Sequence, residues 1–131
     1  MKLSKAQRAE LKQKYGGKCS YCGEELGEKW DADHFIAIKR NWVIKNGKQV
    51  FTDCINPEND TLENMMPSCK SCNNDKSSLS IEDWRSMIAN KITCLNRDST
   101  TYQKAKRYGL VIETNIDVVF WFEKYKEQGD E

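Results

Sequence analysis

Cys19-Ser-Tyr-Cys22 and Cys69-Lys-Ser-Cys72 share one Cys-x-x-Cys spacing, and Asn73 follows the second pair at once. Each pair can bend its backbone so that two sulfurs point at one ion, and two pairs can close a tetrahedral Zn²⁺ site. Forty-six residues separate the pairs, whereas a simple zinc ribbon has roughly 15–20. We therefore expect a structural zinc site with a substructure inserted between its two halves.

The size and composition of the chain predict one folded domain over residues 1–131. The chain is 38% hydrophobic and 31% charged, which is typical of a folded protein rather than a disordered one. No apolar run approaches the roughly 20 residues of a membrane-spanning helix, and the N-terminus lacks the apolar stretch of a secretory signal. We expect a cytosolic protein without a membrane partner. Cysteines stay reduced there, which favours metal ligation over disulfides or unrelated thiols and leaves Cys54 and Cys94 free.

The charge distribution gives only weak support for a nucleic-acid partner, because the formal net charge is +1. Basic residues nevertheless cluster near the N-terminus and again after the only histidine, His34. Ordinary solvated faces are the simpler interpretation of such clusters.

Local patterns predict an α+β layout. Ser4 and Gln7 have the spacing of a capping box, and Gly16-Gly17 would end the helix that follows. Residues 30–38 have the apolar content of a short strand. Asn46-Gly47 lies between two strand-like runs from Trp42 to Phe51, which indicates a hairpin with a type I′ turn. Its aromatic residues are expected to pack on the core, as such residues usually do.

The second half of the chain is predicted to be mostly helical. Ser80 and Asp83 precede an amphipathic pattern that runs to Leu95, with its apolar stripe in the core. Thr100 or Thr101 would cap a short helix that runs through Lys106. Residues 111–112 and 118–122 are rich in β-branched and aromatic side chains, which predicts a C-terminal hairpin.

Asp33-His34 has no significance alone, since a lone histidine is more often a surface or core residue than a catalyst. Its context is more specific. The ordered set is Cys19-Ser-Tyr-Cys22, then Asp31-Ala-Asp33-His34-Phe-Ile36, then Glu63-Asn64-Met-Met-Pro-Ser-Cys69-Lys-Ser-Cys72-Asn73-Asn-Asp-Lys76. Over about residues 15–92 this set resembles the HNH endonuclease family, particularly its small zinc-stabilised phage members. A C-terminal extension of about residues 97–131 lies outside the resemblance.

The resemblance implies a ββα-metal (His-Me finger) core with a structural four-cysteine zinc site and flanking helices. The two strands would lie before His34 and near Met65-Met66, and the helix would begin around Cys72. The implied activity is metal-dependent hydrolysis of DNA phosphodiester bonds, which leaves 5′-phosphate and 3′-hydroxyl ends.

The resemblance also gives individual residues a role. Asp33 and Asn73 would hold a catalytic Mg²⁺ or Mn²⁺ through oxygen ligands, and His34 would act as the general base. Asn64 would tie down the loop that carries the histidine. Further possible contacts to phosphate are the basic residues Lys39, Arg40 and Lys76.

One departure from the family concerns the second metal ligand. Many members have histidine where this chain has Asn73, and an amide oxygen favours Mg²⁺ or Mn²⁺ over softer ions. Zn²⁺ would then be confined to the cysteines. Asn74 would become the ligand if the helix began one residue later.

The expected substrate is double-stranded DNA, and a homodimer or phage packaging proteins are candidate partners in a bacterial host. Two alternatives remain open. One is a zinc-stabilised nucleic-acid-binding module without catalysis, because a fold can persist after its activity is lost. The other is an RNA-directed nuclease.

Overall fold

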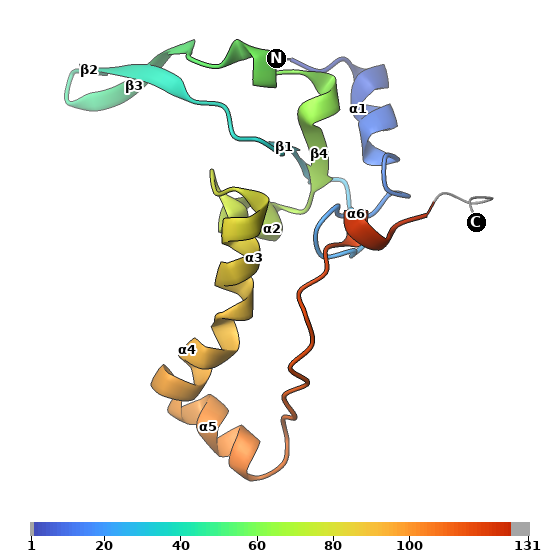
Figure 1. The fold of residues 1–131 in the computed structure, drawn as a ribbon. Helices are drawn as coiled ribbons and strands as arrows, with labels where there is room; N and C mark the ends of the chain where they lie inside the picture. Colours follow the sequence, from blue (N-terminus) through green and yellow to red (C-terminus); the bar gives the residue numbers. More distant parts are fainter. Residues whose placement is uncertain (1, 127–131) are drawn as a thin grey trace. The chain divides into compact units, whose positions relative to one another are not determined.

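The structure is a computed structural model that describes residues 2–126. It has two compact units, and both contain helices. The first holds the described residues up to Ser80 and from Phe120, and the second holds Ile81–Val119. The described strands all lie in the first unit, so the mixture of helices and small sheets is α+β (Figure 1). No helix in the described part of the chain is long and apolar enough to cross a membrane.

The first unit is built around a two-stranded antiparallel sheet. Strand β1 (Asp31–His34) pairs with β4 (Met65–Ser68), with Asp31 opposite Ser68 and His34 opposite Met65. Strand β4 leads directly into helix α2 (Lys70–Lys76), as Figure 1 shows. The strands predicted before His34 and near Met65 are thus present. This short sheet brings together two segments that are far apart in the sequence.

Helix α1 (Lys5–Lys12) begins with the predicted capping box, which is confirmed. The hydroxyl of Ser4 accepts a hydrogen bond from the backbone N–H of Gln7, and the Gln7 side chain accepts one from the N–H of Ser4. Gly16 and Gly17 follow with φ angles of 76° and 79°, a region that disfavours side chains. The chain therefore turns there toward the first cysteine pair.

Strands β2 (Arg40–Lys45) and β3 (Lys48–Cys54) form the predicted hairpin. Both turn residues, Asn46 and Gly47, have positive φ angles of 51° and 75°, as a type I′ turn requires. Trp42 and Phe51 face each other across the strands but are 55% and 59% exposed. The expectation that they pack on the core is wrong, because this ribbon is exposed on both of its faces.

Short turns connect β3 to β4. They are the 3₁₀ helices η1 (Pro57–Asn59) and η2 (Leu62–Asn64). Asp60, between them, donates its backbone N–H to the carbonyl of Pro57.

The second unit contains α3 (Ile81–Ala89), α4 (Lys91–Asp98) and α5 (Thr100–Arg107). The amphipathic pattern predicted as one helix is divided at Asn90 into α3 and α4. Its apolar stripe is core only at Trp84, since Ile92 and Leu95 are exposed. Ser99, rather than either threonine, caps α5, because its hydroxyl accepts a hydrogen bond from the N–H of Tyr102.

The predicted C-terminal hairpin is wrong. Residues 110–120 have no regular secondary structure, and Trp121–Lys124 form helix α6. Polar side chains anchor the extended segment instead: the Glu113 carboxylate accepts hydrogen bonds from Asn96 and Tyr102. These bonds, with that of Asn96 the largest contribution, lower the pKa of Glu113 to about 2. β-branched and aromatic content is thus a weak predictor of a strand when no partner strand is available.

The segment that begins at Phe120 returns to the first cysteine pair. The N–H groups of Trp121 and Phe122 donate to the carbonyls of Tyr21 and Ser20, at 3.0 and 2.8 Å. The Phe120 ring is 2% exposed and meets Tyr21 edge-on at 5.9 Å between ring centroids. An aromatic cluster therefore covers the backbone that carries the first two cysteines.

We predict that Phe120→Ala lowers the free energy of unfolding by about 3–5 kcal/mol, because it removes a fully packed ring. Urea denaturation followed by circular dichroism measures the loss. Phe51→Ala is the matched control, since the exposed Phe51 should change stability by less than about 0.5 kcal/mol. Equal effects of the two substitutions would contradict the aromatic core.

Candidate functional site

Four cysteine sulfurs form a cluster in the first unit. The Sγ atoms of Cys19, Cys22, Cys69 and Cys72 all lie within 4.8 Å of one another, and those of Cys22 and Cys69 are 4.0 Å apart. Tetrahedral zinc with Zn–S bonds of about 2.3 Å needs sulfur–sulfur separations of about 3.8 Å. The cluster is therefore positioned to hold a metal ion such as zinc.

The local backbone explains why the sulfurs converge. In the first pair, the N–H of Cys19 donates to Glu24 O, and the N–H of Gly23 donates back to Cys19 O. Gly23 has a φ angle of 79°, which favours glycine. In the second pair, Cys69 is the N-cap of α2 and its sulfur accepts from the N–H of Cys72 at 3.4 Å. The cluster thus joins the first loop to the first turn of α2.

The electrostatics of the cluster fit a cation. A hydrogen bond from the Cys72 side chain lowers the pKa of the Cys19 thiol to about 4, while burial raises that of Cys22 to about 11. Thiols this close cannot all ionise unaided, because like charges raise one another's pKa. A divalent cation removes that repulsion, and thiolates are the ligands that zinc prefers.

His34 lies at the end of β1, and its imidazole is paired with a carboxylate. Its Nε2 is 2.9 Å from Oδ1 of Asp60, and each of the two side chains is 19% exposed. The hydrogen bond with His34 is the largest cause that lowers the pKa of Asp60. The histidine therefore has a partner that its sequence neighbourhood did not indicate.

Asn64 holds the loop that follows His34. Its amide Oδ1 accepts from the N–H of Ile36, and its Nδ2 donates to the carbonyls of Ile36 and Asn59 at 2.9 and 2.6 Å. Its backbone carbonyl also accepts from the N–H of Phe35. One side chain thus connects the histidine loop to the turn that precedes Asp60.

Asp33 lies in a buried polar cluster with Tyr21 and Lys76. Its Oδ2 accepts a hydrogen bond of 2.5 Å from the Tyr21 hydroxyl and lies 3.1 Å from the ammonium of Lys76. Burial, followed by the charge of Asp33, raises the pKa of Tyr21. The Lys76 ammonium also donates to the backbone carbonyl of His34 at 3.2 Å.

Lys76 is 0% exposed. The expectation that it contacts a phosphate is therefore wrong, because its ammonium is enclosed and paired with Asp33. The other two basic residues singled out from the sequence, Lys39 and Arg40, are exposed at the start of the hairpin. Neither lines the pocket that contains His34.

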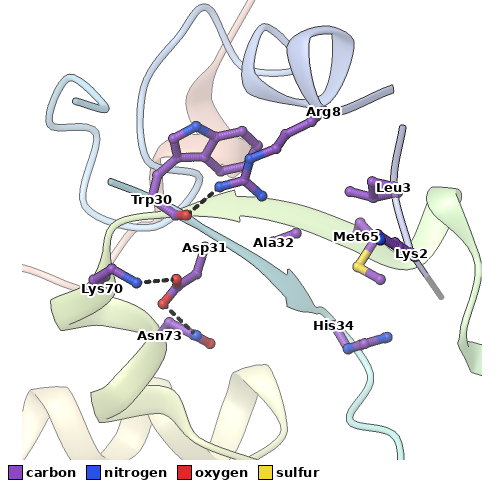
Figure 2. A pocket seen from close by; sticks show the side chains of 10 residues that line it. All are labelled: Lys2, Leu3, Arg8, Trp30, Asp31, Ala32, His34, Met65, Lys70 and Asn73. Atoms are coloured by element: carbon purple, nitrogen blue, oxygen red, sulfur yellow. Dashed lines mark hydrogen bonds and ion pairs between the residues drawn. The ribbon is translucent and has the colours of Figure 1, made fainter. Parts of the chain in front are cut away.

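That pocket lies beside β1 and the start of α2, and its volume is about 660 Å³. Figure 2 shows its lining: Lys2, Leu3, Arg8, Trp30, Asp31, Ala32, His34, Met65, Lys70 and Asn73. His34 and Asn73 are thus brought to one pocket, whereas Asp33 is not among its lining residues. Asp33 instead contacts Tyr21 and Lys76 in the buried polar cluster.

Asp31 is the carboxylate of β1 that lines the pocket beside Asn73. Its carboxylate accepts from the amide of Asn73 at 2.9 Å and from Lys70 at 2.7 Å. The bond from Lys70 is the largest cause that lowers the pKa of Asp31. Lys70 and Asn73 lie three residues apart on α2, so both reach the same carboxylate from one helix face.

The pocket also carries positive charge from the N-terminal segment. The Arg8 guanidinium lies 4.0 Å from the centre of the Trp30 ring and donates to the Trp30 carbonyl at 2.7 Å. Lys2 and Lys70 line the same pocket. Nothing in the sequence distinguishes Arg8 from the other basic residues, because only the fold places it at the pocket.

Comparison with known proteins gives one informative match. The chain is 28% identical over 82 residues to "SPbeta prophage-derived putative HNH endonuclease YoqL" of Bacillus subtilis (strain 168). The match covers 63% of this chain and 33% of that protein, so the chain spans about a third of the relative's length. No family model and no solved structure matches the chain. The similarity is distant and suggests the HNH family.

We predict that the protein binds zinc and that Cys69→Ser loses it and has a sharply lower melting temperature, because a metal ion at the four sulfurs would join two distant segments. Zinc content by elemental analysis and thermal unfolding by circular dichroism measure the two effects. Cys54→Ser is the control. Cys54 lies outside the cluster, so this variant should keep its zinc. Retention of a full zinc equivalent by Cys69→Ser would contradict the four-sulfur site.

We also predict that Asp33→Asn lowers the free energy of unfolding by about 3–5 kcal/mol, because it leaves the Lys76 ammonium buried without a counter-charge. The double variant Asp33→Asn/Lys76→Met should recover much of that loss. Urea denaturation measures both changes. Asp31→Asn is the control and should cost less than about 1 kcal/mol, since its ion pair with Lys70 is partly exposed.

Proposed function

We propose that this chain is a metal-dependent DNA endonuclease of the HNH type, with β1, β4 and α2 as its ββα-metal core. The observation that carries the proposal is the pocket that His34 and Asn73 share with three cationic side chains. The similarity to a protein named as an HNH endonuclease supports the same activity. Weak homology to a nuclease also makes a nucleic acid the expected substrate.

His34 is the proposed general base. Its imidazole would accept a proton from the water that attacks the scissile phosphorus, since a neutral imidazole is a competent proton acceptor. The cleaved bond would leave 5′-phosphate and 3′-hydroxyl ends. Asn64 holds the adjacent backbone through its two hydrogen bonds with Ile36, which limits movement of the base.

The cations in the pocket are the proposed contacts to the DNA backbone. Arg8 and Lys70 could bind phosphate oxygens, the usual partners of such side chains in DNA complexes. Trp30 fixes the plane of the Arg8 guanidinium. These cations are expected to contact phosphates and not base edges. We therefore propose that the chain binds the backbone of duplex DNA without recognising its sequence.

Asp33 and Asn73 are the proposed ligands of the catalytic ion, because carboxylate and amide oxygens suit Mg²⁺ or Mn²⁺. Both contacts of Asp33 use Oδ2, which leaves Oδ1 for an ion, and ligating carboxylates are commonly held in this way. When bound, the ion would neutralise charge on the phosphate and on the leaving 3′ oxygen. Asp31 is a second candidate ligand, because it lines the pocket next to Asn73.

The test is cleavage of supercoiled plasmid at about pH 8 with Mg²⁺, Mn²⁺ or EDTA. We expect metal-dependent nicking or linearisation, and His34→Ala should lower the rate by about 10²–10⁴-fold because the general base is lost. Circular dichroism and zinc content show whether the variant is folded. Asp31→Asn and the double variant Asp33→Asn/Lys76→Met show which carboxylate the reaction requires.

Two outcomes would favour other functions. If the folded protein shifts duplex DNA in a gel but does not cut it with either metal, a zinc-stabilised binding module is the better account. If it cuts RNA and leaves duplex DNA intact, the chain is an RNA-directed nuclease. Analytical ultracentrifugation with DNA would separate a nicking monomer from a dimer that cuts both strands.

A further inference from the structure

The partner of the histidine is a residue that the proposed reaction has not yet used. Asp60 Oδ1 lies 2.9 Å from Nε2 of His34, and both side chains are mostly enclosed, at 19% exposure. An exposed ion pair of this kind would carry little weight. This pair is instead half-buried, and it includes the one histidine of the chain, which lines the pocket.

The chemistry of the contact determines which ring nitrogen is free. A carboxylate can only accept a hydrogen bond, so the nitrogen facing it must carry the proton. The neutral imidazole is then the Nε2–H tautomer, and Nδ1 keeps the lone pair. A general base needs that lone pair directed at the proton it removes.

We propose that Asp60 is a positioning residue of the active site: it holds His34 as the Nε2–H tautomer and makes Nδ1 the atom that accepts the proton from water. This inference rests on the proposed nuclease activity and deepens it. Asp60 does not touch the substrate in this role. It acts through the orientation of the imidazole, as a carboxylate acts on a histidine ligand or base in other sites.

The backbone around Asp60 supports a fixed orientation. The N–H of Asp60 donates to the carbonyl of Pro57 at 3.0 Å, which closes the η1 turn. The carbonyl of Asn59 accepts from the Asn64 amide at 2.6 Å. The same amide donates to the carbonyl of Ile36, two residues after His34. Both members of the pair are therefore tied to one side chain.

The test combines cleavage kinetics with nuclear magnetic resonance. Asp60→Ala should lower kcat for a duplex oligonucleotide by about 10–100-fold and change KM by less than about threefold, because Asp60 orients the base without binding DNA. Asp60→Asn retains an acceptor oxygen and should recover part of the rate. In ¹⁵N-labelled protein at about pH 8, the single imidazole should report Nε2–H in the wild type and a tautomer mixture in Asp60→Ala.

Glu58→Ala is the matched control, since it removes the same charge from an exposed position of the same turn. It should leave kcat and the tautomer unchanged. Thermal unfolding and zinc content show that each variant is folded.

The outcomes separate this inference from the proposed function. A wild type that cuts, together with an Asp60→Ala variant that cuts at the same rate, would overturn the role of Asp60 and leave the nuclease in place. A wild-type spectrum with the proton on Nδ1 would overturn it as well. A folded wild type that cuts no nucleic acid with either metal would overturn the nuclease first, and the positioning role with it.

Discussion

The convergence of four sulfurs is the constraint on which the rest of the first unit depends. Cys19 and Cys22 lie in a loop, while Cys69 and Cys72 lie at the start of α2. The sheet between these regions has only two strands of four residues, which is too little to be stable alone in water. The four cysteines are positioned to hold a metal ion, and an ion bound there would supply a link that the small sheet cannot. It would fix the start of α2, which carries Asn73.

A second level of order comes from hydrogen-bonded side chains rather than from apolar packing. Asn64 connects the loop after His34 to the turn before Asp60. Lys76, from α2, reaches both the Asp33 carboxylate and the carbonyl of His34. A buried network of this kind is rigid when every member is satisfied, and no described side chain in it is left buried without a partner.

The sequence predicted those parts of the fold that short-range chemistry determines. The capping box at Ser4, the turn at Asn46-Gly47 and the two cysteine pairs each depend on a few neighbouring residues, and all are present. The C-terminal hairpin failed because strands need partners, and the nearby polar groups around Glu113 provided another anchor. The helix predicted through Asn90 failed because an apolar period does not show where a helix is interrupted.

Within the site, the sequence predicted two of the residues that line the pocket, but it did not predict the side chains that contact them. His34 and Asn73 share a pocket, but the carboxylates beside them are Asp60 and Asp31. Asp60 lies in a turn with no recognisable pattern, so only the fold brings it to the histidine. Lys76 shows the reverse case, since a lysine on a short helix is usually solvated and this one is enclosed. Burial of that kind depends on the whole fold and cannot be read from a local motif.

Hydrogen bonds between the segments that flank the β2–β3 hairpin hold its base together, and they do not involve the turn at its tip. Asn56 accepts a hydrogen bond from the N–H of Lys39 and donates one to the carbonyl of Ala37, and the N–H of Ile55 donates to Lys39 O. Beyond this closure the strands are exposed, and doubling the length of a flexible loop costs only about 0.6 kcal/mol in closure entropy. The hairpin is thus a place where insertions and deletions can accumulate over evolution while the pocket keeps its form.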